Sequence, residues 1–301
     1  MNILVWFRVF ILFATLFFEH ILANTYNETL ALNYIDFAGA AYCCGTLGSG
    51  CDDWSCPSCH RNLETVVIED KSTNANGFVG YDADLNKIII SFAGTDPLSI
   101  RNWVVDIETE KVPFVGYGAN ASYVACYGDC KVHKGFYEAY LSVGQSVRDA
   151  VKRYQDKAPQ PPAIITTGHS LGAALAQHAA LDLSSTQEDS VESLYNYGQP
   201  RTGNSAFANF SANLLGGRTF RVTHHKDPVP QLPFERWGFH QEVLEVFYEA
   251  QAFKAGGFKL CTAGEGEDPS CSDKYAVDLN VVDHLTYMGF DFIANYLICK
   301  L

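Results

Sequence analysis

The chain has 301 residues, of which 48% are hydrophobic and 18% are charged, and this composition excludes a disordered or low-complexity polymer. The formal net charge of −13 repels phosphate backbones, which argues against nucleic acid as a partner. Because no linker-like segment divides the sequence, we expect a single globular domain over residues 24–301.

The first 23 residues have the pattern of a secretory signal peptide. Arg8 precedes an apolar run from Val9 to Phe18, and Ala23 supplies a small residue for cleavage. The run is short for a bilayer core of about 30 Å, so an uncleaved membrane anchor is the weaker alternative. We therefore expect residues 1–23 to be a signal peptide and the protein to be secreted or delivered to a lysosome-like lumen.

The cysteines and glycosylation sequons agree with that compartment. All ten cysteines follow the signal segment, and an even number in an oxidising compartment favours disulfides. Cys56 and Cys59 have the spacing of a zinc-ligand pair, but a second close pair is missing, so we expect no metal. Sequons at Asn27, Asn120 and Asn209 make sense only on a lumenal or secreted surface.

The spacing of apolar residues predicts an α/β protein. Helices are predicted over residues 28–42, 135–153, 171–183 and 204–214, and strands over residues 64–70, 78–81, 87–92, 163–167, 194–197 and 219–223. From residue 135 onward strands and helices alternate, which implies crossover connections. We therefore expect a mixed, mostly parallel central sheet with helices on both faces.

Ser170 is the candidate nucleophile. Residues 166–172 (TTGHSLG) lie where a predicted strand ends and a helix begins, the context that a GxSxG nucleophile elbow requires. Gly168 and Gly172 let strand and helix approach closely, so the strained turn directs the Ser170 hydroxyl outward. The helix start also favours a nearby oxyanion. The simpler alternative is that Ser170 only caps the helix.

A serine nucleophile needs an imidazole base and a carboxylate that orients it. In this fold class the order along the chain is Ser, then Asp or Glu, then His. Asp227 follows strand 219–223 in a proline-stiffened loop, which leaves His240 and His284 as bases. His240 follows closely in an aromatic stretch, where packing is the better explanation. His284 opens a final segment that must return to the sheet edge, and we choose it.

Three further histidines flank these positions. His169 precedes the nucleophile, and we interpret it as a packed, hydrogen-bonded neighbour. His224 and His225 precede Asp227, and we expect them to orient its loop or to face solvent.

The oxyanion hole needs two hydrogen-bond donors fixed in advance. The residue after the nucleophile, Leu171, supplies one backbone N–H. Strand 87–92 runs into AGTD, where Gly94 permits a sharp turn and Thr95 offers its N–H and its hydroxyl. We therefore predict Thr95 and Leu171 as the donors. An ordinary turn is the alternative reading of AGTD.

Taken together, these segments resemble the fungal-type class 3 lipases. The motifs that carry the resemblance, in chain order, are IIISFAGT, SIRNWVVDI, VHKGF, TGHSLGAAL, YGQPRTGNSAFANF, VTHHKDPVPQLP and VDHLTYMG. The resemblance implies a single α/β-hydrolase-like domain without metal or organic cofactor. It also implies Ser170, Asp227 and His284 as the triad and Thr95 with Leu171 as the oxyanion hole. Ala173 stands where many members have glycine, a change small enough to leave the turn intact.

The same resemblance suggests how the cysteines pair. It implies Cys43 or Cys44 with Cys299, Cys56 with Cys59, Cys126 with Cys130, and Cys261 with Cys271. The remaining pair would join one of Cys43 and Cys44 to Cys51.

Residues 97–107 follow the oxyanion loop and predict a short amphipathic helix. Ile100, Trp103, Val104 and Ile107 form one apolar stripe. A helix this short depends on what its stripe packs against. The partner is either the acyl groove over Ser170 or, after the segment swings away, a lipid surface. Given the resemblance we interpret it as a lid, with a fixed helix on the core as the alternative.

Three functions remain open. The leading one is a secreted, monomeric triacylglycerol lipase that acts at lipid interfaces and touches the lipid transiently through the lid. The second keeps the fold and triad but hydrolyses another ester, such as a phospholipid, a galactolipid or a feruloyl ester. The third is a catalytically silent lipid-binding protein, which the intact Ser170, Asp227 and His284 disfavour.

Overall fold

The computed structural model describes residues 26–45, 50–51, 53–60, 62–117, 126, 128–185, 191–242, 244–261, 266–276 and 278–300. The expected signal peptide over residues 1–23 and the sequon at Asn120 lie outside these residues. Among the described helices, none is long and apolar enough to span a bilayer.

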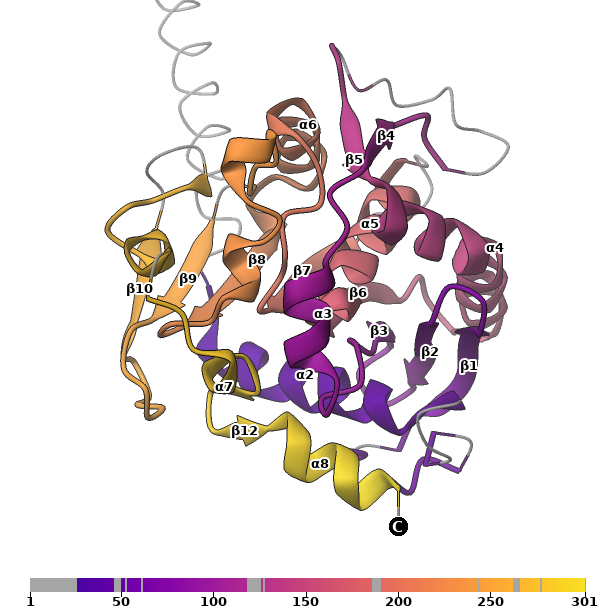
Figure 1. The fold of residues 1–301 in the computed structure, drawn as a ribbon. Coiled ribbons are helices and arrows are strands. Elements are labelled where there is room, and N and C mark those ends of the chain that lie inside the picture. Colours follow the sequence, from indigo (N-terminus) through magenta and orange to yellow (C-terminus); the bar gives the residue numbers. More distant parts are fainter. Residues whose placement is uncertain are drawn as a thin grey trace, which may run out of the picture.

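An eight-stranded mixed sheet forms the centre of the protein (Figure 1). Its strands, in spatial order, are β1 (Glu64–Asp70), β2 (Ala75–Asp82), β3 (Lys87–Phe92), β6 (Ala163–His169), β7 (Val191–Tyr197), β8 (Thr219–His224), β9 (Glu245–Tyr248) and β10 (Phe258–Cys261). Strands β3, β6, β7, β8 and β9 run parallel, whereas β1, β2 and β10 join antiparallel at the two ends. The expected mixed, mostly parallel sheet is confirmed.

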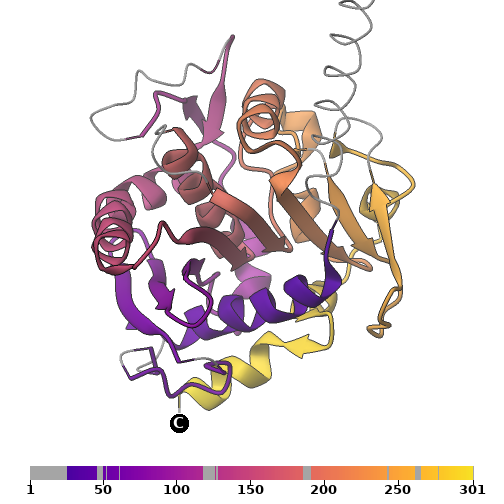
Figure 2. The same cartoon turned by 180° about the vertical axis from the view of Figure 1, so that it is seen from behind.

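Helices cover both faces of this sheet (Figures 1 and 2). The helices α4 (Lys134–Lys157), α5 (Leu171–Ser185) and α6 (Ser205–Leu215) lie on one face, and α2 (Glu28–Ala40) with α8 (Phe292–Cys299) lies on the other. The alternation within β3 shows why two cores form. Ile88 and Ile90 pack toward α4 and α5, while Ile89 between them packs toward α2.

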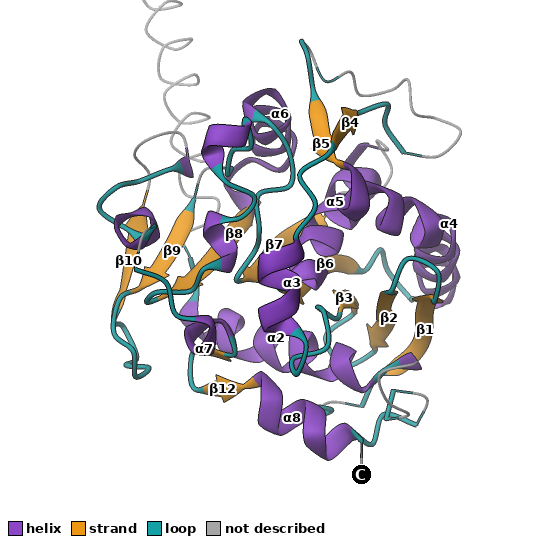
Figure 3. Ribbon diagram, in the orientation of Figure 1, coloured by secondary structure: helices purple, strands orange, loops and turns teal. Residues whose placement is uncertain are grey.

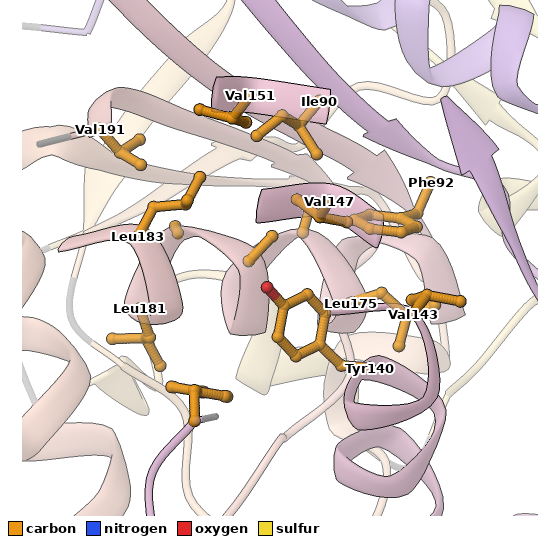
Figure 4. Close-up of a cluster of buried hydrophobic side chains, with 14 of the residues drawn as sticks. Ile90, Phe92, Tyr140, Val143, Val147, Val151, Leu175, Leu181, Leu183 and Val191 are labelled. Carbon is orange, nitrogen blue, oxygen red and sulfur yellow. The ribbon is translucent and has the colours of Figure 1, made fainter. Parts of the chain in front are cut away.

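The core between the sheet and α4 and α5 is built from regular apolar spacing (Figure 4). Val143, Val147 and Val151 recur every four residues along α4 and are almost fully buried. They pack with Ile90 of β3 and Leu175 of α5. This layer packs against the sheet that contains β6, and Ser170 directly follows the last residue of β6.

The remaining elements are short (Figure 3). They are the helices α3 (Ile100–Asp106) and α7 (Val281–His284), the strands β4 (Lys111–Pro113), β5 (Lys131–His133), β11 (Thr286–Tyr287) and β12 (Phe290–Asp291), and the 3₁₀ helices η1 (Ala41–Cys43), η4 (Gly216–Arg218), η5 (Val229–Gln231), η6 (Glu235–Trp237) and η8 (Ser272–Tyr275). Apart from α3 and the first two residues of η1, which the predicted helix over residues 28–42 includes, the sequence pattern predicts none of the short helices and strands. Each spans too few residues for its periodicity to be recognised.

All ten cysteines form disulfides, and the pairing implied by the resemblance is confirmed. The bonds are Cys43–Cys299, Cys44–Cys51, Cys56–Cys59, Cys126–Cys130 and Cys261–Cys271. The choice between Cys43 and Cys44 is thereby resolved, and Cys43 ties η1 to the last turn of α8.

Candidate active site

Ser170 lies in a strained turn between β6 and α5. Its φ is 59°, in the left-handed region that serine rarely adopts. Its N–H donates to the carbonyl oxygen of Tyr197 on the neighbouring strand, over 3.0 Å. A Cβ on Gly172 would lie 2.6 Å from the carbonyl carbon of Phe92 in β3, and a Cβ on Gly168 would collide with Gly172. The two glycines are therefore required by close backbone packing, as the elbow motif predicts.

Asp227 and His284 form a buried pair. Asp227 follows β8, and its Oδ1 accepts the N–H of Val229 over 2.8 Å, which fixes the carboxylate within its loop. His284 ends α7, and its Nδ1–H donates to Asp227 Oδ2 over 2.8 Å. Both side chains are almost completely buried. With Nδ1 as the donor, His284 Nε2 carries a lone pair and can accept a proton.

The three residues meet around the end of β7. Ser170 binds the carbonyl of Tyr197, and a Cβ on the next residue, Gly198, would lie 2.8 Å from His284 Cε1 and 2.9 Å from Asp227 Oδ2. Within the described residues, Ser170 Oγ and His284 Nε2 are buried and have no hydrogen-bond partner. Such orphaned atoms are costly unless a ligand uses them.

The predicted oxyanion donors lie beside Ser170. A Cβ on Gly94 would stand 2.8 Å from Ser170 Cβ and 2.7 Å from the His169 carbonyl oxygen, so the turn after β3 can approach only as glycine. Thr95 follows this turn, and its buried Oγ1 has no hydrogen-bond partner among the described residues. Thr95 and Leu171 line the same cavity.

His169 connects the elbow to neighbouring elements, as a packed and hydrogen-bonded neighbour would. Its Nε2–H donates to the carbonyl oxygen of His284 over 2.8 Å, and its Nδ1 accepts the hydroxyl of Tyr42 over 2.7 Å. Its ring stacks on Phe292, with the centroids 3.8 Å apart. Burial, and then the charge of His284, hold the pKa of His169 well below its usual value of 6.5. His169 is therefore neutral.

The other histidines near Asp227 are used differently. His224 is buried and His225 is partly exposed, and both donate to Asp283, the residue before His284. The alternative base, His240, has its Nδ1 3.8 Å from a carboxylate oxygen of Glu267. The same Nδ1 lies 3.9 Å from a carboxylate oxygen of Glu235, so His240 is placed near two carboxylates, and its side chain is largely buried.

One residue of this site is missed by the sequence reasoning. The Tyr287 hydroxyl donates to Asp227 Oδ2, the oxygen that also accepts from His284. Tyr287 is buried, and its burial together with the Asp227 charge raises its pKa well above 10. A signal was available, because Tyr287 stands three residues after His284 in VDHLTYMG.

A cavity of about 630 Å³ adjoins the oxyanion residues. The helix α3 forms part of its wall through Trp103 and Ile107, and Phe136 at the start of α4 also lines it, with its ring centroid 6.5 Å from that of Trp103. Ile100 is buried and instead lines a second hollow, of about 310 Å³, between α3 and α7. The side chains of the predicted apolar stripe therefore line two different hollows. Val104 is only partly buried and lines neither of them.

The sequence matches the family model for lipase (class 3) over residues 89–237. It is 32% identical to a lipase from Rhizomucor miehei over 89% of this chain and 71% of that protein. It is 29% identical to secreted mono- and diacylglycerol lipase 1 from Fusarium solani, over 84% of this chain and 74% of that protein.

Solved structures give the same likeness. A triacylglycerol lipase whose catalytic centre is described as a serine protease triad superposes with a TM-score of 0.74 at 28% identity, over 92% of this chain and 98% of that one. The Rhizomucor miehei triacylglyceride lipase superposes with a TM-score of 0.73 at 28% identity, over 92% of this chain and 99% of that one.

Proposed function

This chain belongs to the class 3 lipase family, and we propose that it cleaves triacylglycerols by a Ser170, His284 and Asp227 triad. As a member it is a carboxylic ester hydrolase. The observation that carries the proposal is the convergence of the strained Ser170 with the buried His284–Asp227 pair at the end of β7. The relatives' names support acylglycerols as substrates and secretion as the destination.

The geometry supports an acyl-enzyme mechanism. His284 Nε2 takes the proton of Ser170 Oγ as that oxygen attacks the ester carbonyl, and Asp227 stabilises the imidazolium that forms. The N–H groups of Thr95 and Leu171 stabilise the oxyanion. The imidazolium then protonates the departing glycerol oxygen. Water, activated by the same imidazole, hydrolyses the acyl-enzyme and releases the fatty acid.

A substrate panel with a Ser170→Ala variant tests this function. The wild type should hydrolyse emulsified long-chain triacylglycerol faster than phosphatidylcholine, a galactolipid or a feruloyl ester. Ser170→Ala should lose activity by several orders of magnitude and keep its melting temperature, because only a buried hydroxyl is removed. Faster cleavage of another ester would move the assignment to that ester. Residual activity above a tenth of the wild type would reject the nucleophile.

We also propose that α3 is an interfacial lid. Trp103 and Ile107 turn toward the cavity that Thr95 and Leu171 line, while Val105 is 81% exposed and Leu98, just before the helix, is 63% exposed. A seven-residue helix has little stability of its own, so it can exchange one apolar partner for another. The inner side chains would then meet lipid when the helix swings away from the cavity.

The lid proposal predicts a difference between two substrates. Trp103→Ala should impair hydrolysis of emulsified triacylglycerol about tenfold more than hydrolysis of a soluble short-chain ester, because the bulk of a tryptophan face is lost at the lipid surface. Trp237→Ala, which removes an exposed tryptophan of η6, is the control and should affect both substrates equally. Equal losses in Trp103→Ala would identify α3 as a fixed helix. Sedimentation should find a monomer in solution.

A further inference from the structure

The helix that carries His284 cannot position it alone. Helix α7 has four residues, and so short a helix is unstable without outside contacts. His284 nevertheless must hold its Nε2 toward Ser170 while its Nδ1 binds Asp227. The contacts that fix α7 therefore decide how accurately the base is placed.

The residue before the base, Asp283, receives several such contacts. Its side chain is 2% exposed, and its Oδ2 accepts the Nδ1–H of His225 over 2.8 Å and the N–H of Lys226 over 3.3 Å. Its backbone carbonyl accepts the Nδ1–H of His224 over 3.0 Å. The N–H of Asn280, just before α7, donates to the Lys226 carbonyl over 2.7 Å.

These contacts join two consecutive stretches of chain. The three residues before Asp227 hold the residue before His284, so the acid and the base of the triad are connected twice: once directly, and once through a second carboxylate–imidazole pair. A buried carboxylate is stable only when it is paired. Any movement of α7 away from the Asp227 loop would therefore leave Asp283 unpaired, which opposes that movement.

We propose that Asp283, held by His225 and His224, is a positioning residue that fixes the orientation of His284. This inference rests on the proposed triad. Asp283 faces His224, His225 and Lys226 from the Asp227 loop, with Tyr287 also nearby. The ring of His284 itself faces Asp227, His169 and Tyr287.

The test is Asp283→Asn, which keeps the shape of the side chain and removes its charge. With a soluble short-chain ester, kcat should fall about tenfold to a hundredfold with little change in KM, because the base is misplaced and the substrate site is not. The acidic limb of the kcat/KM profile should move to lower pH, because a displaced His284 loses part of its contact with Asp227, the carboxylate that stabilises its imidazolium. A merely structural role for Asp283 would not move that limb.

Asp278→Asn is the matched control. Asp278 is exposed and pairs with Lys226 of the same loop, so its removal deletes a carboxylate from the same neighbourhood without touching Asp283. Its kcat and pH profile should remain those of the wild type. A second pair of variants tests the donor: His225→Asn retains an N–H at the position of Nδ1 and should keep most of the activity, whereas His225→Ala should resemble Asp283→Asn.

An NMR titration of the His284 ring separates this inference from the function it rests on. In Asp283→Asn the ring should titrate at lower pH than in the wild type, whether or not the protein hydrolyses the ester tested. Active sites can be counted with a phosphonate that reacts with the serine, and kcat is then expressed per active site. An unchanged titration of His284, or an unchanged kcat per active site, would overturn the positioning role. Full activity in Ser170→Ala would instead overturn the proposed function.

Discussion

Ser170 and His284 both lie at the end of β7 and are held there by different means. Ser170 is held by backbone: β3 pairs with β6 from Lys87↔Ala163 to Phe92↔Gly168, and close glycine contacts then force the turn. His284 is held by side chains, from Asp227, from His169 and from the contacts at Asp283. The first arrangement comes from sheet geometry, and the second depends on a few polar groups.

This difference suggests how the two sides respond to change. On the nucleophile side, a substitution that adds one carbon meets backbone that cannot move, so it should damage the fold. On the base side, a substitution removes a hydrogen bond and leaves the sheet intact, so it should damage the rate before the stability.

The largest effect is expected from removing the base. His284→Ala should lower kcat/KM for a soluble ester by several orders of magnitude, because Ser170 then has no proton acceptor. His240→Ala should cost far less, because its Nδ1 lies near Glu267. Steady-state kinetics on both variants decide between them. If His240→Ala is the more damaging change, the base has been assigned to the wrong histidine.

The region around Ser170 and the region around His284 also differ in how much of each can be predicted from the sequence. The elbow and the Gly94–Thr95 turn follow strands with clear apolar patterns, so local signals locate them. Chain order also selected Asp227 and His284, which the structure joins directly. The contacts of Asp283 with His224 and His225 could not be predicted, because they join short segments far apart in the chain. Local spacing carries no information on such contacts.

The second effect concerns the Cys43–Cys299 disulfide, which ties the segment after His284 to η1. Its sequence separation is 256, so the chain-entropy model assigns it about 5.5 kcal/mol of stability. The Cys56–Cys59 bond, with a separation of 3, should contribute about 2 kcal/mol by the same model. Denaturant unfolding of the two double-alanine variants measures both. Equal losses would show that loop length does not govern these bonds.

The third effect tests the backbone placement of Ser170. Gly172→Ala should destabilise the protein by roughly 3 kcal/mol or more, because its Cβ would meet backbone atoms of Phe92 and Ala93. Gly144→Ala in α4 is the control, since its Cβ would meet only side-chain atoms, at 3.3 Å or farther. That change should be neutral or stabilising, because alanine favours helix. Similar melting temperatures for the two variants would contradict backbone control of the elbow.

The smallest effect is a pH dependence of stability that arises beneath the elbow. His178 of α5 is fully buried next to Tyr117, with 2.7 Å between its Nδ1 and the tyrosine hydroxyl, and burial lowers its pKa to about 3. In the unfolded chain a histidine titrates at about 6.5. As the pH falls, His178 therefore binds a proton in the unfolded state before it does so in the folded state. This contribution to stability is complete above pH 6.5 and is lost as the pH falls toward 3.

Other buried groups complicate the wild-type curve, so the prediction is made on a difference. Burial lowers the pKa of His133 to about 4, which adds to the loss in acid. Burial raises the pKa values of Asp182 and Glu242, which has the opposite sign, because these folded carboxyls bind protons more readily than unfolded ones. His178→Asn removes one titrating group and leaves the others, including His169, whose pKa is also lowered by burial. The variant should be less stable than the wild type at pH 7, because the ring is lost from a packed core. Its free energy of unfolding should nevertheless fall less steeply between pH 6.5 and pH 4. Urea unfolding at several pH values measures both slopes, and parallel curves would mean that His178 does not remain neutral in the folded protein.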